Sequence, residues 1–185
     1  MNLANRLTVL RILLVPIFIA SLLYSAPDRF YLHNMAIGIY LLACATDGLD
    51  GYLARHRNET TQFGSYIDPL ADKLLLLSGY LSLSLMPHLP DSMRVPAWVT
   101  LAVLSRDIVI LAGAILIFIS TGSLKAQPLF IGKVTTVVQM ATLLSALLEL
   151  PWNVRVGLYI LTVVMTALSG ILYIRMGGRM MKDAG

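Results

Sequence analysis

Long apolar runs separated by short polar segments recur along the whole chain. A helix needs about 20 mostly apolar residues to cross a membrane, and six stretches come close to or exceed that length. They are Leu7–Tyr24, Tyr31–Leu53, Phe63–Met86, Pro96–Ile119, Leu129–Leu150 and Val154–Met176. Together they occupy most of the 185 residues and leave no room for a second domain. The pattern predicts an all-α integral membrane protein with six transmembrane helices in one domain, residues 1–185.

Composition agrees with a membrane protein. Hydrophobic residues make up 57% of the chain and charged residues 13%, whereas charged residues make up about 25% of an average soluble domain. The first apolar run is not a cleavable signal peptide, because Pro16 interrupts it and no A-x-A-like site follows. The pI of 9.4 comes without a basic stripe interleaved with aromatics, so we expect membrane lipids as partners and no nucleic acid.

The basic residues predict an orientation. With six spans both termini lie on one side, together with most of the Lys and Arg residues. That side collects Arg6, Arg11, Arg55, Arg57, Lys125, Lys133, Arg175, Arg179 and Lys182, against Arg29, Arg94 and Arg155 on the other. The positive-inside rule then places both termini in the cytoplasm. We expect a multi-pass protein of a bacterial inner membrane or an equivalent membrane.

Four carboxylates stand where the apolar runs meet the predicted cytoplasmic side. Asp47 and Asp50 close the second run, and Asp68 and Asp72 open the third. Each pair is spaced i,i+3 or i,i+4 and shares a helix face, and the polar turn Arg55–Gln62 between them is short. Unpaired, each charge would cost at least about 2.5–3.5 kcal/mol within the bilayer. We therefore expect the four to converge on Mg²⁺ or Mn²⁺, two ions per active site, which faces the cytoplasm.

Small residues accompany these acids. Gly51, Ala54 and Gly64 alternate with them, which favours space for a bound ligand. Close helix packing explains Gly48, Ser65 and Ala71 equally well. Zinc is not favoured, because His33 and His88 fall near the other membrane face and His56 stands alone.

Read as one string, the segment from Asp47 to Asp72 has the spacing D-x2-D-G-x2-A-R-x8-G-x3-D-x3-D. All eight specified residues of this CDP-alcohol phosphotransferase signature are present, so the chain resembles that family and its six-helix membrane fold. The segment Asn5-Arg-Leu-Thr-Val-Leu-Arg11 is similar to the family's entry into its first helix. The run from Ile131 to Gln139 resembles the branches that make phosphatidylglycerophosphate and cardiolipin.

The resemblance implies an enzyme that uses CDP-diacylglycerol to transfer a phosphatidyl group to an alcohol and releases CMP. It implies two divalent ions on the four aspartates, with Asp72 also acting as the general base. It further implies a CDP pocket and a homodimer. The pocket residues carried over are Asp50, Gly51, Ala54, Arg55 and Gly64.

The acceptor is less defined. Arg106 and Lys133 are basic residues inside or at the edge of the bilayer, where they could bind a phosphate. An Arg106–Asp107 or interhelix ion pair, or snorkelling by Lys133, would explain them without a ligand. Lys133 and its neighbours favour glycerol 3-phosphate as acceptor, whereas the Ser-Arg-Asp sequence ending at Asp107 is closer to cardiolipin synthases, which use phosphatidylglycerol.

An ion-coupled transporter is the alternative from another class, because intramembrane carboxylates also line ion paths. Against it, the acids lie at one depth, the chain has no inverted repeat, and the Gly, Ala and Arg spacing would remain unexplained. The sequence therefore favours the enzyme.

Overall fold

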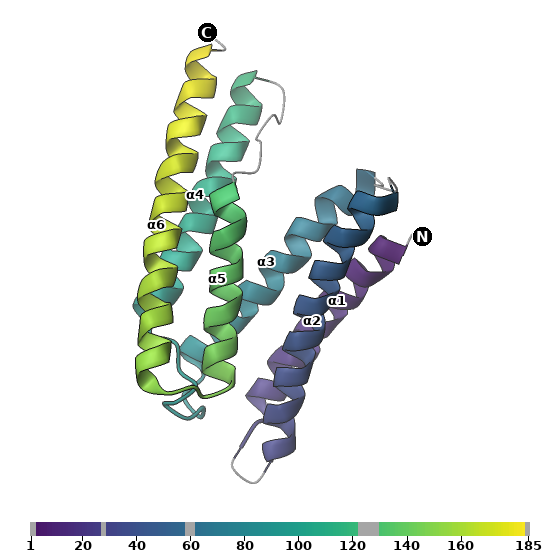
Figure 1. Ribbon diagram of the computed structural model, residues 1–185, viewed down its shortest axis with the longest axis vertical. Coiled ribbons are helices and arrows are strands. Elements are labelled where there is room, and N and C mark those ends of the chain that lie inside the picture. The colour runs from purple at the N-terminus through teal and green to yellow at the C-terminus, as the bar shows by residue number, and fades with distance from the viewer. Residues whose placement is uncertain (1–2, 27–28, 58–61, 122–129, 184–185) are drawn as a thin grey trace. The chain divides into compact units, whose positions relative to one another are not determined.

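The computed structural model describes residues 3–26, 29–57, 62–121 and 130–183 (Figure 1). For residues 3–7, 47–57, 62–72, 117–118, 120–121 and 179–183 it describes the backbone alone. The described residues form helices and no strand. The helices are α1 (Leu3–Leu23), α2 (Phe30–Arg57), α3 (Gln62–Leu85), α4 (Ala97–Thr121), α5 (Phe130–Leu147) and α6 (Trp152–Asp183).

Each predicted apolar run therefore corresponds to one helix, so the all-α prediction is confirmed. The largest difference is at the end of α6, which continues seven residues past the predicted Met176 to Asp183. Another difference concerns the turn expected from Arg55 to Gln62. α2 continues to Arg57 and α3 begins at Gln62, so this turn is shorter than we expected. α1 also continues through Pro16.

The helices group into two compact units. Unit 1 comprises Met1–Val95 with Ala146–Glu149, and unit 2 comprises Pro96–Ser145 with Leu150–Gly185. The prediction of one domain over residues 1–185 stays a prediction.

Unit 1 is built around α1, which packs against both α2 and α3. Leu14, Phe18 and Leu22 are buried and spaced four residues apart on α1, so they form one face of the helix. Phe18 meets the buried Tyr40 of α2, with ring centroids 5.9 Å apart. This apolar face explains why both neighbours pack on α1.

Arg11 lies on the same buried side of α1. Only 1% of its surface is exposed, as for Thr8 one helical turn earlier. The sequence predicts Arg11 to be one of the basic residues that orient the protein toward the cytoplasm. Its burial shows that it is part of the interior of unit 1, where a charged group must be paired.

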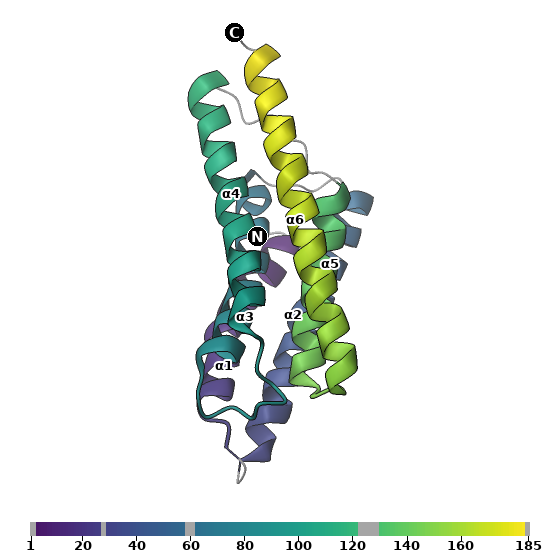
Figure 2. The same ribbon diagram turned by 90° about the vertical axis from the view of Figure 1, so that its left-hand side faces the viewer.

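In unit 2, α4 packs against α6 (Figure 2), and hydrogen bonds join α5 to α6. The Thr142 and Thr162 hydroxyls lie 2.7 Å apart, and the Gln139 amide donates to the Thr166 hydroxyl at 3.3 Å. The Thr135 hydroxyl donates to the carbonyls of Ile131 and Met165. Such side-chain hydrogen bonds typically hold membrane helices together. Apolar surface alone gives a helix little preference for another helix, because the surrounding lipid is equally apolar.

The outer face of α4 is apolar. Five large side chains on it are each at least 50% exposed, at intervals of seven, three, four and four residues: Leu101, Ile108, Leu111, Ile115 and Ile119. A soluble monomer seldom exposes a contiguous apolar stripe of this extent. The face is suited to lipid.

Three helices are long and apolar enough to cross a membrane by length and composition: Ala97–Leu116, Phe130–Leu147 and Trp152–Gly178. Within the described residues, the apolar parts of the other helices are shorter, at Thr8–Leu23, Phe30–Thr46 and Lys73–Leu85. A membrane protein is therefore supported, while six spans remain a prediction.

The turn after α5 contains the one non-glycine residue with positive φ among those described. Glu149 has φ of 50°, its N–H donates to the Ala146 carbonyl, and the Leu150 N–H donates to the Ser145 carbonyl. These two bonds form a Schellman motif, in which glycine is the usual residue at this position. The Glu149 carboxylate accepts a hydrogen bond from Ser92 and lies 3.9 Å from His33 Nε2, which explains why a side chain is kept here.

We expect Glu149→Ala to lower the melting temperature of the purified protein, and Glu149→Gly to lower it less. Both variants lose the contacts with Ser92 and His33, but only alanine keeps the backbone strain, which is about 1 kcal/mol. Circular dichroism during heating in detergent measures the difference. Equal melting temperatures for the two variants would contradict a strained turn.

Candidate active site

The four predicted metal ligands lie on two consecutive helices of unit 1. Asp47 and Asp50 belong to α2, and Asp68 and Asp72 belong to α3. Only residues 58–61 separate these helices in the sequence, so the end of α2 and the start of α3 cannot lie far apart. The side chains of these four residues lie outside the described part of the structure, as do those of Gly51, Ala54, Arg55 and Gly64.

The helix bounds place the acids at matching distances from this connection. Asp47 lies ten residues before Arg57, and Asp72 lies ten residues after Gln62. At 1.5 Å per residue each is about 15 Å from its helix end. Asp50 and Asp68 lie seven and six residues from the same ends, about 10 Å along each helix. If the two helices run antiparallel from this connection, Asp47 lies at the same height as Asp72, and Asp50 lies at about the same height as Asp68.

Carboxylates in two level pairs fit a site for hard divalent cations. Among the residues whose side chains are described, no three His, Cys, Asp or Glu side chains gather in a way that could hold a metal. His33 and Glu149 approach each other in unit 1, but His88 bonds the Leu22 carbonyl through Nε2, 3.0 Å away. The acids of α2 and α3 thus remain the metal candidate.

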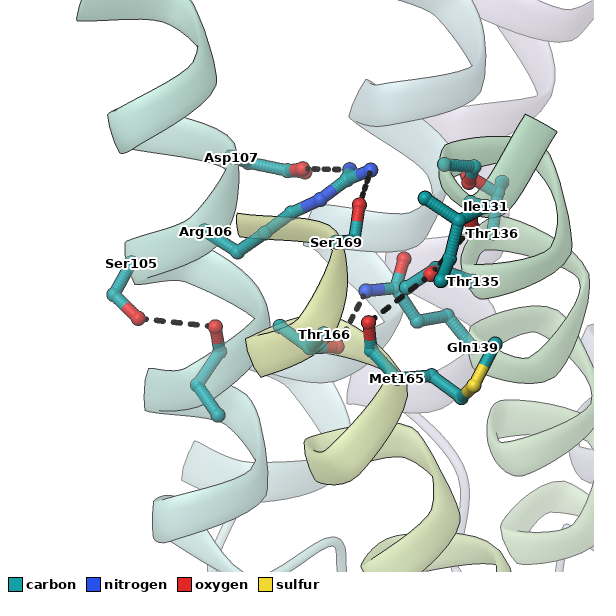
Figure 3. A network of polar contacts seen from close by, with 12 residues as sticks. Ser105, Arg106, Asp107, Ile131, Thr135, Thr136, Gln139, Met165, Thr166 and Ser169 are labelled. Carbon is teal, nitrogen blue, oxygen red and sulfur yellow. Dashed lines mark hydrogen bonds and ion pairs between the residues drawn. The ribbon is translucent and has the colours of Figure 1, made fainter. Parts of the chain in front are cut away.

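Arg106 of α4 belongs to a cluster of polar side chains in unit 2 (Figure 3). Its side chain is 7% exposed. Nη1 donates to Asp107 Oδ1 at 2.7 Å, and Nη2 donates to the Ser169 hydroxyl of α6 at 3.1 Å. The guanidinium carbon lies 5.9 Å from the ring centre of Tyr173. The ion pair considered from the sequence is therefore present, and α6 adds a hydroxyl and an aromatic face.

The Arg106 cluster continues the row of hydrogen bonds between α5 and α6. Along α6, Thr162, Thr166 and Ser169 follow at intervals of four and three residues, and all three are buried. Figure 3 shows Gln139 and Thr135 of α5 reaching toward α6, one turn from Ser169. Arg106 is thus held by a framework of fixed polar groups.

Lys133, the other acceptor candidate, lies in the first turn of α5 and is exposed. Its neighbour Gly132 is buried against the Arg106 cluster. A Cβ atom on Gly132 would lie 3.1 Å from Tyr173 Oη and 3.3 Å from Arg106 Nη2. The structure therefore brings the start of α5 to Arg106, whereas the Lys133 side chain points to the surface.

A mostly apolar groove of about 330 Å³ lies between α4 and α6 near this cluster. Its lining includes Ile110, Gly113, Ile174 and Gly177, and it also includes Tyr173. Tyr173 therefore contacts both the groove and the guanidinium of Arg106. The arrangement combines a buried cation with apolar space.

Sequence reasoning assigned no role in the site to three residues of this cluster, although Gly132 lies in the run from Ile131 to Gln139 that carries part of the family resemblance. Ser169, Tyr173 and Gly132 carry no signal by composition, because small residues are common at contacts between membrane helices and tyrosine is common near membrane surfaces. Their spacing does carry one, because Thr162, Thr166, Ser169 and Tyr173 share a helix face. Only an interhelix contact could relate that face to Arg106.

A model of the CDP-alcohol phosphatidyltransferase family matches residues 1–169. The chain is also similar to the probable phosphatidylglycerophosphate synthase of Mycobacterium tuberculosis strain H37Rv. The two are 32% identical over 187 residues, which cover 100% of this chain and 84% of that protein.

Two further relatives have names that describe different reactions. The CDP-diacylglycerol–glycerol-3-phosphate 3-phosphatidyltransferase of Bacillus subtilis is 33% identical, over 80% of this chain and 77% of its own length. Human CMP-forming cardiolipin synthase is 32% identical, over 69% of this chain and 46% of its own length.

Proposed function

Since the chain belongs to the CDP-alcohol phosphatidyltransferase family, we propose that it transfers the phosphatidyl group of CDP-diacylglycerol to glycerol 3-phosphate. The products are phosphatidylglycerophosphate and CMP. Relatives named for this reaction match most of the chain. The observation that carries the proposal is the placement of Asp47, Asp50, Asp68 and Asp72 at matching distances along α2 and α3.

On the donor side, we assign Asp47, Asp50, Asp68 and Asp72 to two divalent ions, Mg²⁺ or Mn²⁺. Bound there, the ions would neutralise the pyrophosphate of the donor and the charge on departing CMP. Gly51, Ala54 and Gly64 would leave room beside the acids for the cytidine and pyrophosphate, and Arg55 would pair with a phosphate oxygen.

The transfer itself needs a base. An acceptor hydroxyl oxygen attacks the phosphorus attached to diacylglycerol, and the bond from that phosphorus to the bridging pyrophosphate oxygen breaks. Asp72 takes the hydroxyl proton, and CMP leaves with the bridging oxygen. Asp72 suits this role because it lies one helical turn beyond Asp68 and can be reached from the same site.

On the acceptor side, we assign Arg106 and Lys133 to the phosphate of glycerol 3-phosphate. Arg106 is buried and held in one orientation by Asp107 and Ser169. Lys133 is exposed and could meet a soluble anion arriving from water. A fixed guanidinium and a mobile ammonium together suit a small dianion.

We further propose that all six helices cross the membrane. α1, α2 and α3 have 21, 28 and 24 residues, so at 1.5 Å per residue each exceeds the hydrocarbon thickness of about 30 Å. The basic residues then place both termini and the acids of α2 and α3 at the cytoplasmic face of a bacterial inner membrane or its equivalent. The homodimer that the family resemblance implies stays a prediction.

The second candidate is a cardiolipin synthase that uses phosphatidylglycerol as acceptor. The apolar groove between α4 and α6 favours it, because it lies beside Tyr173 and could hold an acyl chain of a lipid acceptor. The human relative carries this activity in its name. The chemistry at the acids would be unchanged, since only the alcohol differs.

The decisive experiment offers labelled CDP-diacylglycerol and Mg²⁺ to the purified protein with one acceptor at a time. We expect phosphatidylglycerophosphate and CMP from glycerol 3-phosphate, and no product from serine or inositol phosphate. Cardiolipin formed from phosphatidylglycerol, with no product from glycerol 3-phosphate, would reassign the acceptor. No CMP release with any acceptor would refute the transferase.

Substitution of the acids tests the metal site. Asp47→Asn, Asp50→Asn and Asp68→Asn should each abolish turnover and weaken divalent-ion binding, because each removes an anionic ligand while keeping the side-chain shape. The melting temperature of each variant checks folding. Near-wild-type activity at low Mg²⁺ in any two of them would eliminate the two-ion site.

Asp72→Asn is the matched comparison for these variants. If Asp72 is mainly the base, catalysis should fall about 10²–10⁴-fold while metal and CDP-diacylglycerol binding are partly retained. A loss of donor binding as large as that of Asp47→Asn would make Asp72 an ordinary metal ligand.

Lys133→Ala should raise the KM for glycerol 3-phosphate about tenfold or more, because a charge-assisted hydrogen bond contributes about 1.5–3 kcal/mol. The KM for CDP-diacylglycerol should change little. Arg175→Ala, which removes another exposed cation of unit 2, is the control and should behave like wild type. An equal change in both KM values for Lys133→Ala would exclude a specific acceptor contact.

A further inference from the structure

Arg106 is a buried cation, and one of its three nitrogens has no hydrogen-bond partner among the described residues. A guanidinium has five N–H groups. Asp107 accepts a bond from Nη1 and Ser169 accepts one from Nη2, but Nε has no partner among the described residues, although it is buried. A buried donor without a partner costs about 1–3 kcal/mol, so this atom calls for an explanation.

The unpaired atom lies on the edge of the guanidinium that suits an oxyanion. The N–H of Nε and one N–H of Nη2 point to the same side of the planar group, and this pair can bind two oxygens of one phosphate or carboxylate. Asp107 bonds the other terminal nitrogen, Nη1. Ser169 bonds Nη2, which keeps a second N–H. Nη1 likewise keeps a second N–H, so what distinguishes the Nε–Nη2 edge is Nε, which has no partner among the described residues.

Gly132 packs closely against the Nη2 end of this edge. A Cβ atom there would lie 3.3 Å from Nη2 and 3.1 Å from Tyr173 Oη, closer than ordinary van der Waals contact. Gly170 of α6 offers a contrast, because a Cβ on it would lie 3.9 Å from Arg106 Cγ, an ordinary contact. The need for glycine is therefore specific to the α5 side.

Charge also limits what Arg106 can bind by itself. The Arg106–Asp107 pair is close to neutral as a whole, so it offers an oxyanion hydrogen bonds with little net attraction. A dianion would need another cation nearby. Lys133 follows Gly132 directly in the chain and is exposed, so it can supply that charge from the surface.

We propose that the Nε–Nη2 edge of Arg106 is a preformed binding site for the phosphate oxygens of the acceptor, which we call the phosphate seat. Residues with no assigned role shape this site. Asp107 and Ser169 are positioning residues that fix the orientation of the guanidinium. Gly132 determines how large a group the seat admits. The inference rests on the proposed transferase, and it applies to the monoester of glycerol 3-phosphate and to the diester of phosphatidylglycerol alike.

The test compares Gly132→Ala with Gly170→Ala, measured with CDP-diacylglycerol and each acceptor in separate assays. Gly132→Ala should raise the KM of the productive acceptor about tenfold, as expected for loss of a charge-assisted bond, with the donor KM unchanged. Gly170→Ala should behave like wild type. The assay in which Gly132→Ala raises the acceptor KM identifies whether glycerol 3-phosphate or phosphatidylglycerol binds at this site.

Ser169 supplies a second pair of variants. Ser169→Ala removes the bond to Nη2 and should raise the acceptor KM, whereas Ser169→Thr keeps a hydroxyl and should restore it. Melting temperatures separate these effects from unfolding. Equal acceptor KM values for the two glycine variants, or a parallel rise in the KM of the donor, would contradict the proposal that this edge of Arg106 binds the acceptor.

Direct binding separates this inference from the proposed reaction. Calorimetric titration of glycerol 3-phosphate into wild-type protein should give binding that Gly132→Ala weakens and Gly170→Ala does not. If wild type releases no CMP with any acceptor but this binding pattern holds, the reaction is wrong and the seat stands. If CMP is released and the pattern fails, the reaction stands and the seat is wrong.

Discussion

Polar groups inside this protein must find partners within the chain, because its outer faces are apolar and suited to lipid rather than water. The exposed stripe of α4 and the buried threonines of α5 and α6 are two consequences of this constraint. Helices satisfy their own backbone, which leaves side chains such as Gln139 and Thr142 to pair across helix contacts. In unit 2, the same contacts that hold α5 to α6 end at Arg106.

Arg106 shows how this constraint produces a candidate site. A buried guanidinium must be neutralised and hydrogen-bonded, and Asp107 and Ser169 do most of this. The groups that satisfy Arg106 also remove its freedom to rotate. An arginine held in one orientation, with Nε still unused, is better prepared to bind an oxyanion than a flexible surface arginine would be.

The acidic and the basic residues proposed for the site belong to different units. The acids of the signature motif belong to α2 and α3 in unit 1, and the basic candidates belong to α4 and α5 in unit 2. The family match, residues 1–169, covers residues from both units.

The sequence by itself determined the six helices, because runs of about 20 apolar residues have few other stable structures. It also determined the metal candidates, since the spacing from Asp47 to Asp72 carries the family signature without any tertiary contact. Only the tertiary structure decided the surroundings of Arg106. Ser169, Tyr173 and Gly132 lie 63, 67 and 26 residues from it in the chain, and no local spacing relates them to Arg106. The packing of α4 and α5 against α6 brings them together, because buried polar groups far apart in the sequence can be satisfied only across helices.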